Sequence, residues 1–116
     1  MTAGMSDTML ARVAERFRVL GEPARLRILN VLRTHPELTV SQLVDATQLG
    51  QANLSKHLQL LHGGGFVSRR REGLYVWYSL ADAGTAALCD VMCARLEREA
   101  QLEREPDARE HRHALR

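Results

Sequence analysis

Apolar residues recur every three or four positions over most of the first 62 residues, as they do along the buried face of an α-helix. This spacing predicts helices over about residues 9–20, 23–32, 40–47 and 51–62. Pro23 is suited to the first turn of the second helix, and Thr39 to the N-cap of the third. Because residues 48–50 leave room only for a tight turn, the third and fourth helices are predicted to form a helix-turn-helix. The buried side of the second helix is expected to comprise Leu26, Ile28, Leu29 and Leu32.

The residues that follow Gly63–Gly65 are rich in strand-forming types and contain one turn signal. Glu72-Gly73 is interpreted as a two-residue turn, which pairs Arg71 with Leu74 and Val67 with Tyr78. A register shifted by one residue stays open. One face of this hairpin is expected to carry Val67, Leu74, Val76 and Tyr78. The other face is expected to carry Arg70, Tyr75 and Trp77.

A last helix is predicted from about Ala83 to Glu105, with Asp82 as its cap and Pro106 as its end. The predicted fold class is therefore mostly α with a small β-hairpin wing. Its order is four helices, the two-stranded wing and a fifth helix, which is a winged helix-turn-helix. Residues 1–105 are expected to form a single domain, and residues 106–116 a short charged tail.

Composition and charge narrow the class of protein. A chain of 116 residues with 45% hydrophobic content is long enough for one modest core. No stretch resembles a signal peptide or a membrane span, so we expect a cytoplasmic protein with no membrane partner. Residues 1–80 hold ten Lys and Arg against six Asp and Glu, whereas residues 81–116 hold six against eight. The basic excess therefore belongs to the part that contains the helix-turn-helix and the wing.

The fourth predicted helix carries polar side chains opposite an apolar stripe. Leu54, Leu58 and Leu61 recur at helical spacing and should pack against the domain. A helix that enters the major groove of DNA needs such a polar side, because short polar side chains bond to base edges there. The residues expected at DNA are Gln51, Asn53, Ser55, Lys56 and His57, with a partly buried packing role open for His57.

Three consecutive arginines, Arg69, Arg70 and Arg71, lie in the first strand of the predicted wing. A hairpin beside a recognition helix would hold them along the phosphate backbone, where binding is independent of sequence and weakens with salt. Helix and wing together predict a protein that binds double-stranded DNA.

Three segments of the chain carry a family pattern in its order and spacing. They are Leu-Gly-Glu-Pro-Ala-Arg-Leu-Arg-Ile-Leu at 20–29, Ser-Lys-His-Leu at 55–58, and Arg-Arg-Glu-Gly at 70–73 with Tyr-Ser-Leu at 78–80. Over about residues 9–96 the chain resembles the ArsR/SmtB family of winged-helix repressors. The resemblance implies a homodimer, paired through its first and last helices, that represses transcription at a palindromic operator. It also implies release from DNA when a metal, metalloid or oxidant reaches the protein.

The resemblance does not extend to two sensor sites of that family. Its arsenic-responsive branch has a Cys-x-Cys pair in the first helix of the helix-turn-helix, where this chain has Thr39 and Ser41. Hydroxyl groups are poor ligands for soft ions. Its zinc-responsive branch uses Asp and His on the last helix, but here Asp82 is followed two places later by Gly84, and no His comes before His111.

The remaining sensor candidates are Cys89 and Cys93, four residues apart on the last predicted helix and therefore on one side of it, about 6 Å apart at Cβ. They share an apolar stripe with Met92, Leu96 and Ala100. Two subunits meeting there would bring up to four thiols together. Thiolates bind arsenic(III), antimony(III), cadmium, zinc and copper(I), and a site without His or carboxylate favours arsenic(III) or antimony(III). The third ligand would be a partner's cysteine, or His111 or His113 from the tail.

Two other interpretations of the cysteine pair stay open. Paired thiols can respond to oxidants or persulfides, although a disulfide between them would distort the helix. They can also be inert packing residues of a constitutive DNA-binding protein. An enzyme is not expected, because Ser55 and His57 point in different directions on one helix and Gly63–Gly65 is not followed by the Lys-Ser/Thr of a phosphate-binding loop.

Overall fold

The computed structural model describes residues 4–104, and the chain divides into two compact units, residues 1–83 and 84–116, each of which is described by itself. Pro106, His111 and His113 lie outside the described residues. The first unit contains α1 (Asp7–Leu20), α2 (Pro23–Thr34), β1 (Leu38–Thr39), α3 (Val40–Thr47), α4 (Gln51–Gly63), β2 (Val67–Glu72) and β3 (Tyr75–Leu80). The second consists of α5 (Ala83–Glu103), apart from its first residue. The predicted winged helix-turn-helix is confirmed.

Polar side chains cap the first three helices. Ser6 accepts a hydrogen bond from the backbone N–H of Met9, so α1 begins two residues before the predicted start. Thr39 and Gln42 form a capping box at α3, in which each side chain accepts from the other residue's backbone N–H. The predicted cap at Thr39 is therefore confirmed, and α3 begins at a well-defined residue.

The turn between α3 and α4 is held by hydrogen bonds to its own backbone. The buried hydroxyl of Thr47 donates to the Leu43 carbonyl at 2.6 Å and accepts from the Leu49 N–H at 3.3 Å. Gln48 adopts a left-handed conformation with φ of 62°, and its side chain donates to the Asp45 carbonyl at 2.7 Å. These bonds fix the angle at which α4 leaves α3.

The core of the first unit joins α2, α3 and α4 to the sheet. Its fully buried aliphatic side chains are Ile28, Leu29, Leu43, Leu54, Leu58 and Leu61. Leu26, expected on the buried side of α2, is instead 41% exposed, because it lies away from the stripe of Ile28, Leu29 and Leu32. Val19 is the buried residue of α1. The apolar stripe of α4 is buried as predicted.

The hairpin register differs from the expected one. Glu72 pairs with Tyr75, Arg71 with Val76 and Val67 with Leu80, so the turn residues are Gly73 and Leu74. Gly73 has φ of 61°, as a type II′ turn requires at its first central position, and this places the turn one residue later than expected. Leu74 therefore lies in the turn, 94% exposed, and does not pair with Arg71.

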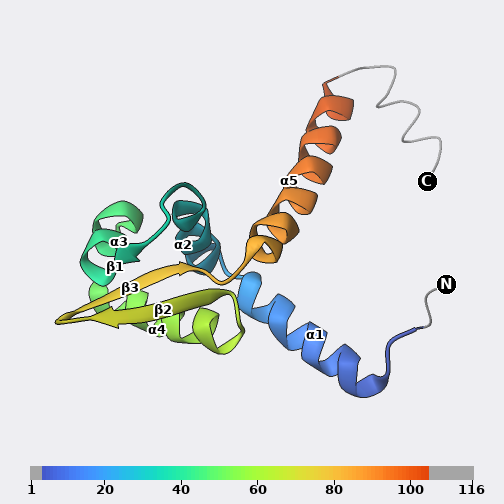
Figure 1. Cartoon of the computed structure of the whole chain (residues 1–116). Coiled ribbons are helices and arrows are strands. Elements are labelled where there is room, and N and C mark those ends of the chain that lie inside the picture. The colour runs from blue at the N-terminus through green and yellow to red at the C-terminus, as the bar shows by residue number, and fades with distance from the viewer. Residues whose placement is uncertain (1–3, 105–116) are drawn as a thin grey trace. The chain divides into compact units, whose positions relative to one another are not determined.

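Apart from Leu74, the predicted faces of the two strands are confirmed, because each pairing partner is shifted by two residues and side chains two apart share a face. Val67 and Tyr78 are buried, whereas Arg70 and Trp77 are direct partners on the opposite face. Strand β1, which the sequence analysis missed, pairs with β3 and gives the sheet the order β1-β3-β2. Figure 1 shows β2 and β3 running side by side next to α4, with their turn at the far end of the wing.

The described part of the chain contains no helix that is long and apolar enough to cross a membrane. This holds for α5 as well, the longest helix of the structure, which carries several charged residues.

Two neighbouring leucines of α4 test which side of the helix supports the fold. Leu61 is fully buried and Leu60 is 45% exposed. We expect Leu61→Ala to lower the free energy of unfolding by about 2–5 kcal/mol, because it leaves a cavity in the core. The matched control Leu60→Ala should cost less than half as much. Urea unfolding at fixed protein concentration measures both, and equal losses would contradict this orientation of α4.

Candidate nucleic-acid interface and cysteine pair

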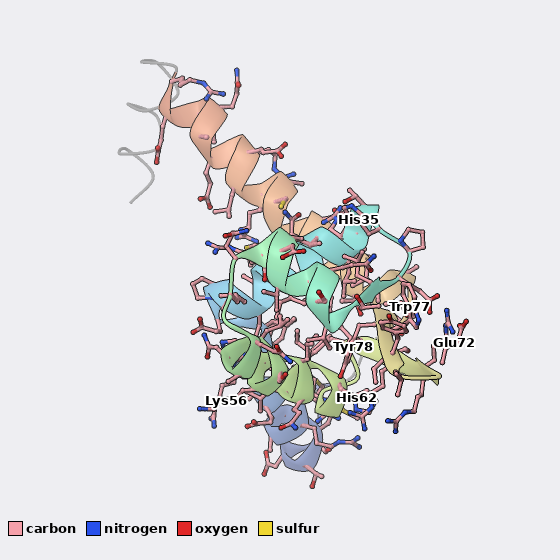
Figure 2. The ribbon with its side chains drawn as sticks, turned by 90° about the vertical axis from the view of Figure 1, so that its left-hand side faces the viewer. His35, Lys56, His62, Glu72, Trp77 and Tyr78 are labelled. Carbon is pink, nitrogen blue, oxygen red and sulfur yellow. The ribbon has the colours of Figure 1, made fainter. Side chains whose placement is uncertain are left out.

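The polar side of α4 is open to solvent along its length. Gln51, Asn53 and Lys56 are exposed, as expected for the polar side of this helix, and Ser55 is half-buried. Figure 2 shows the Lys56 side chain pointing away from the domain. Gln59 is also exposed and lies one turn beyond Lys56 and Ser55, although the sequence analysis missed it. Its spacing of three and four residues from those two was the signal that could have found it.

His57 is tied to the domain by Arg25 of α2. The Arg25 guanidinium lies 3.1 Å from His57 Nδ1 and also donates to the carbonyl oxygen of Val19 at 2.6 Å. Because an arginine can only donate, Nδ1 acts as the acceptor and the ring proton lies on Nε2. Only Nε2 of the half-buried His57 is therefore left for an outside partner. Arg25 connects the end of α1, α2 and α4.

The first turn of α4 has no side-chain cap. Its N-cap residue is Gly50, which has no side-chain oxygen to accept from the backbone N–H groups of the first turn. Free N–H groups and the helix dipole make such an end favourable to anions, and a DNA phosphate is one.

The three arginines of the wing divide between its two faces. Arg69 pairs with Tyr78 and Arg71 with Val76, so these two share the face of the buried Tyr78. Arg70 pairs with Trp77 on the other face. In Figure 2 Tyr78 lies between the hairpin and the helices, whereas Trp77 and Glu72 lie on the outer side. Arg69 and Arg71 therefore follow the side of the wing that faces α4.

Arg70 is engaged by two carboxylates and an aromatic ring. It donates to both oxygens of Glu37, at 2.7 and 2.8 Å, and to Glu72. Its guanidinium also lies 5.6 Å from the centre of the Trp77 ring, within the range of a cation–π contact. These bonds raise the pKa of Arg70 further, and the hydrogen bond from Arg70 holds the pKa of Glu37 below its usual value. Glu37 was not among the residues expected here, because it lies 33 positions from Arg70 in the chain.

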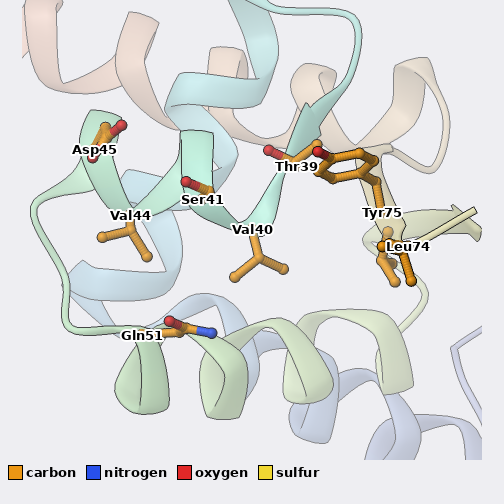
Figure 3. Close-up of a pocket in the computed structure, with 9 residues that line it drawn as sticks. Thr39, Val40, Ser41, Val44, Asp45, Gln51, Leu74 and Tyr75 are labelled. Atoms are coloured by element: carbon orange, nitrogen blue, oxygen red, sulfur yellow. The ribbon is translucent and has the colours of Figure 1, made fainter.

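A hollow of about 340 Å³ lies between α3, the start of α4 and the wing turn. Figure 3 shows Val40 and Val44 on one side of it, Gln51 below them, and Leu74 with Tyr75 across from them. The hollow leaves Gln51 accessible beside the wing. The exposed polar side of α4 and the exposed Arg69 and Arg71 of β2 thus belong to two elements that pack against each other, an arrangement suited to a nucleic-acid groove and backbone.

The cysteine pair lies on α5. Cys89 is half-buried and Cys93 exposed, and both are free thiols. Large apolar side chains of the same helix are also exposed, namely Leu88, Val91, Met92, Leu96 and Leu102. Within the described residues no group of three or more His, Cys, Asp and Glu side chains could hold a metal ion. One protomer therefore offers two thiols, which is fewer than the ligands that a trigonal or tetrahedral ion takes.

The sequence is similar to those of known bacterial regulatory proteins. Residues 22–69 match the family model for bacterial regulatory proteins of the arsR family. A probable mercury resistance operon repressor of Streptomyces lividans is 36% identical over 94 residues, which are 81% of this chain and 73% of that protein.

Two solved structures have the same fold. The crystal structure of Rv0081 of M. tuberculosis superposes with a TM-score of 0.75 at 34% identity, covering 83% of this chain and 96% of that one. The homodimeric winged helix-turn-helix DNA-binding domain of Mb0332 from Mycobacterium bovis, a possible ArsR-family transcriptional regulator, gives a TM-score of 0.71 at 32% identity. It covers 83% of this chain and 91% of that domain.

The bond between Glu37 and Arg70 makes a small part of the stability depend on pH. Because the pKa of Glu37 is lower in the folded chain than its ordinary value of 4.5, this contribution is present above that value and is lost as pH falls through the lowered pKa. The effect is small because solvent reaches both side chains, which are 48% (Arg70) and 33% (Glu37) exposed. We expect Glu37→Gln to flatten the fall of the melting temperature between pH 5 and pH 3, as followed by circular dichroism. An identical pH profile in wild type and variant would contradict the bond.

Proposed function

Because this chain belongs to the ArsR family of bacterial regulatory proteins, we propose that it represses transcription as a homodimer on double-stranded operator DNA. Proteins of this family are DNA-binding transcriptional regulators and not enzymes. The observation that carries the proposal is that α4, with its polar side exposed, packs against β2, whose Arg69 and Arg71 lie on the strand face of the buried Tyr78. A major groove takes a helix of this kind while the wing follows the adjacent backbone.

The contacts divide into two kinds. Gln51 and Asn53 suit adenine edges, since their amides can donate and accept at once. Ser55 and Lys56 suit phosphate or guanine, and Gln59 extends the same side of the helix. Arg69 and Arg71 supply charge to phosphates, which adds affinity without sequence preference. His57 is left with Nε2 only, so its share is a single hydrogen bond.

The homodimer is proposed to form through α1 and α5. In the single chain, Met9, Leu10 and Phe17 of α1 are between 45% and 58% exposed. On α5, Leu88, Val91, Met92 and Leu96 are between 47% and 71% exposed. Apolar surface of this extent is typical of a face that a partner covers. A two-fold pair would present two copies of α4 to successive turns of the major groove, about 34 Å apart.

The effector is proposed to be a soft, thiophilic ion held by Cys89 and Cys93, with arsenic(III) or antimony(III) favoured. The two thiols fit two of the positions that such an ion needs, and their partner copies or His111 or His113 would supply the rest. Support for this class of ligand comes from the relative named as a mercury resistance operon repressor. Ligation would change how the α5 helices pack and so alter the spacing of the two α4 helices. The coupling free energy of such switches is about 1–3 kcal/mol.

Salt dependence tests the DNA surface. A duplex selected by the wild-type protein from a random library serves as the operator, and its affinity is measured by fluorescence anisotropy between 50 and 300 mM salt. Each phosphate contact that is lost should reduce the slope of log K against log salt by about 0.9, so Arg71→Gln should reduce it by about 1.8 in a dimer. Arg18→Gln on α1, the same change outside the proposed surface, should leave the slope unchanged. Equal slopes for all three proteins would remove the wing from the interface.

Effector release tests the cysteine pair. Wild-type protein bound to the selected duplex is titrated with arsenite, antimonite, cadmium, zinc, copper(I), mercury(II) and hydrogen peroxide. We expect Cys89→Ser and Cys93→Ser to keep DNA affinity and to lose release, because an alcohol is a poor ligand for soft ions. Release by peroxide alone would point to a thiol-redox repressor. A wild-type protein that no ion or oxidant releases would make the cysteines packing residues of a constitutive DNA-binding protein.

A further inference from the structure

The Arg70 side chain of the wing donates three hydrogen bonds, and its partners come from two parts of the chain. Glu72 and Trp77 belong to the hairpin itself. Glu37 belongs to the segment that leads into β1, and both of its carboxylate oxygens accept from Arg70. A bidentate pair of this kind fixes distance and direction together.

Glu37 places this bond close to the helix-turn-helix. It precedes β1 directly, and β1 ends at Thr39, the residue that caps α3. β1 also pairs with β3, so Arg70 ties β2 to the segment on the far side of β3. The bond therefore spans the full width of the sheet. Its geometry limits how the hairpin can tilt relative to the start of α3.

The positive charge of Arg70 is neutralised by carboxylates within the protein. Two carboxylates accept from its guanidinium, and the Trp77 ring covers one side of it. Arg69 and Arg71 differ, because within the described residues the side chain of neither has a hydrogen bond or an ion pair, and both lie on the opposite face. A phosphate would have to displace two carboxylates to bind Arg70, but none to bind its neighbours.

On the basis of the proposed function, we infer that Glu37 and Arg70 are a positioning pair, which holds the wing at the angle that brings Arg69 and Arg71 to the DNA backbone. Arg70 itself is not a phosphate ligand. This interpretation replaces the sequence-based expectation that all three arginines bind DNA alike. It also explains why a DNA-binding protein has a carboxylate at Glu37, since a carboxylate repels phosphates and here holds Arg70 instead.

The variant Glu37→Gln separates the two roles of Arg70 by the sign of its effect. If Arg70 bound phosphate, removal of Glu37 would free the guanidinium and delete a negative charge, and affinity for the selected duplex would rise. If the pair positions the wing, Glu37→Gln should weaken binding by about three- to tenfold, in the range of measured pairwise couplings. Arg70→Gln should weaken it to a similar degree with the salt slope unchanged, whereas Arg71→Gln lowers the slope.

A double-mutant cycle and a fluorescence measurement complete the test. The double variant Glu37→Gln/Arg70→Gln should bind no more weakly than Arg70→Gln alone, because Glu37 has already lost its partner in that variant. Glu15→Gln on α1 is the matched control for the loss of one carboxylate and should bind as wild type. Trp77, the only tryptophan of the chain, should emit at longer wavelength in both single variants, because the guanidinium no longer covers its ring.

The possible results distinguish failure of the positioning role from failure of the proposed function. Tighter or unchanged binding by Glu37→Gln overturns the positioning role, and so does a lowered salt slope for Arg70→Gln. If the wild-type protein binds no duplex, the proposed function fails. The Trp77 emission still decides in that case whether Glu37 holds Arg70 on the ring, and an unchanged spectrum would reject the pair.

Discussion

The orientation of α4 depends on one apolar stripe. Leu54, Leu58 and Leu61 are all but fully buried against α2, α3 and the sheet, and an α-helix with one buried stripe has only one side left for solvent. That side carries amides, a hydroxyl and an ammonium group. Each buried leucine contributes about 1.5–3 kcal/mol relative to an exposed one, so rotation of the helix is far more costly than any single DNA contact. The polar surface is therefore fixed before any ligand arrives.

Two arginine side chains connect the elements around α4. Arg25 joins α1, α2 and α4 through the Val19 carbonyl and His57. Arg70 joins the wing to the segment before β1. Both arginines use several donors at once, which a lysine cannot do with the same geometry. In this molecule arginine therefore serves two purposes, since Arg25 and Arg70 have partners within the protein while Arg69 and Arg71 remain open.

Local signals explain how much of this could be predicted. Single residues predicted where two helices begin, since Pro23 opens α2 and Thr39 caps α3. The spacing of apolar residues predicted the buried leucines of α4 and the two faces of the strands. The register of the wing depended on which residue takes the positive φ, and the choice of Glu72-Gly73 placed the turn one residue too early. Strand β1 was missed because two residues carry no periodicity. The Arg25–His57 and Arg70–Glu37 contacts join residues 32 and 33 positions apart, and no pattern in a single sequence indicates such pairs.

In the proposed complex, two copies of α4 and its wing bind one DNA duplex. A hydroxyl-radical footprint of the wild-type protein on the selected duplex reports which sugars the protein covers. We expect two protected half-sites related by two-fold symmetry, with centres one helical turn (~10 base pairs) or a multiple of it apart. A single protected segment without symmetry, or no protection at concentrations at which the protein is dimeric, would rule out this complex.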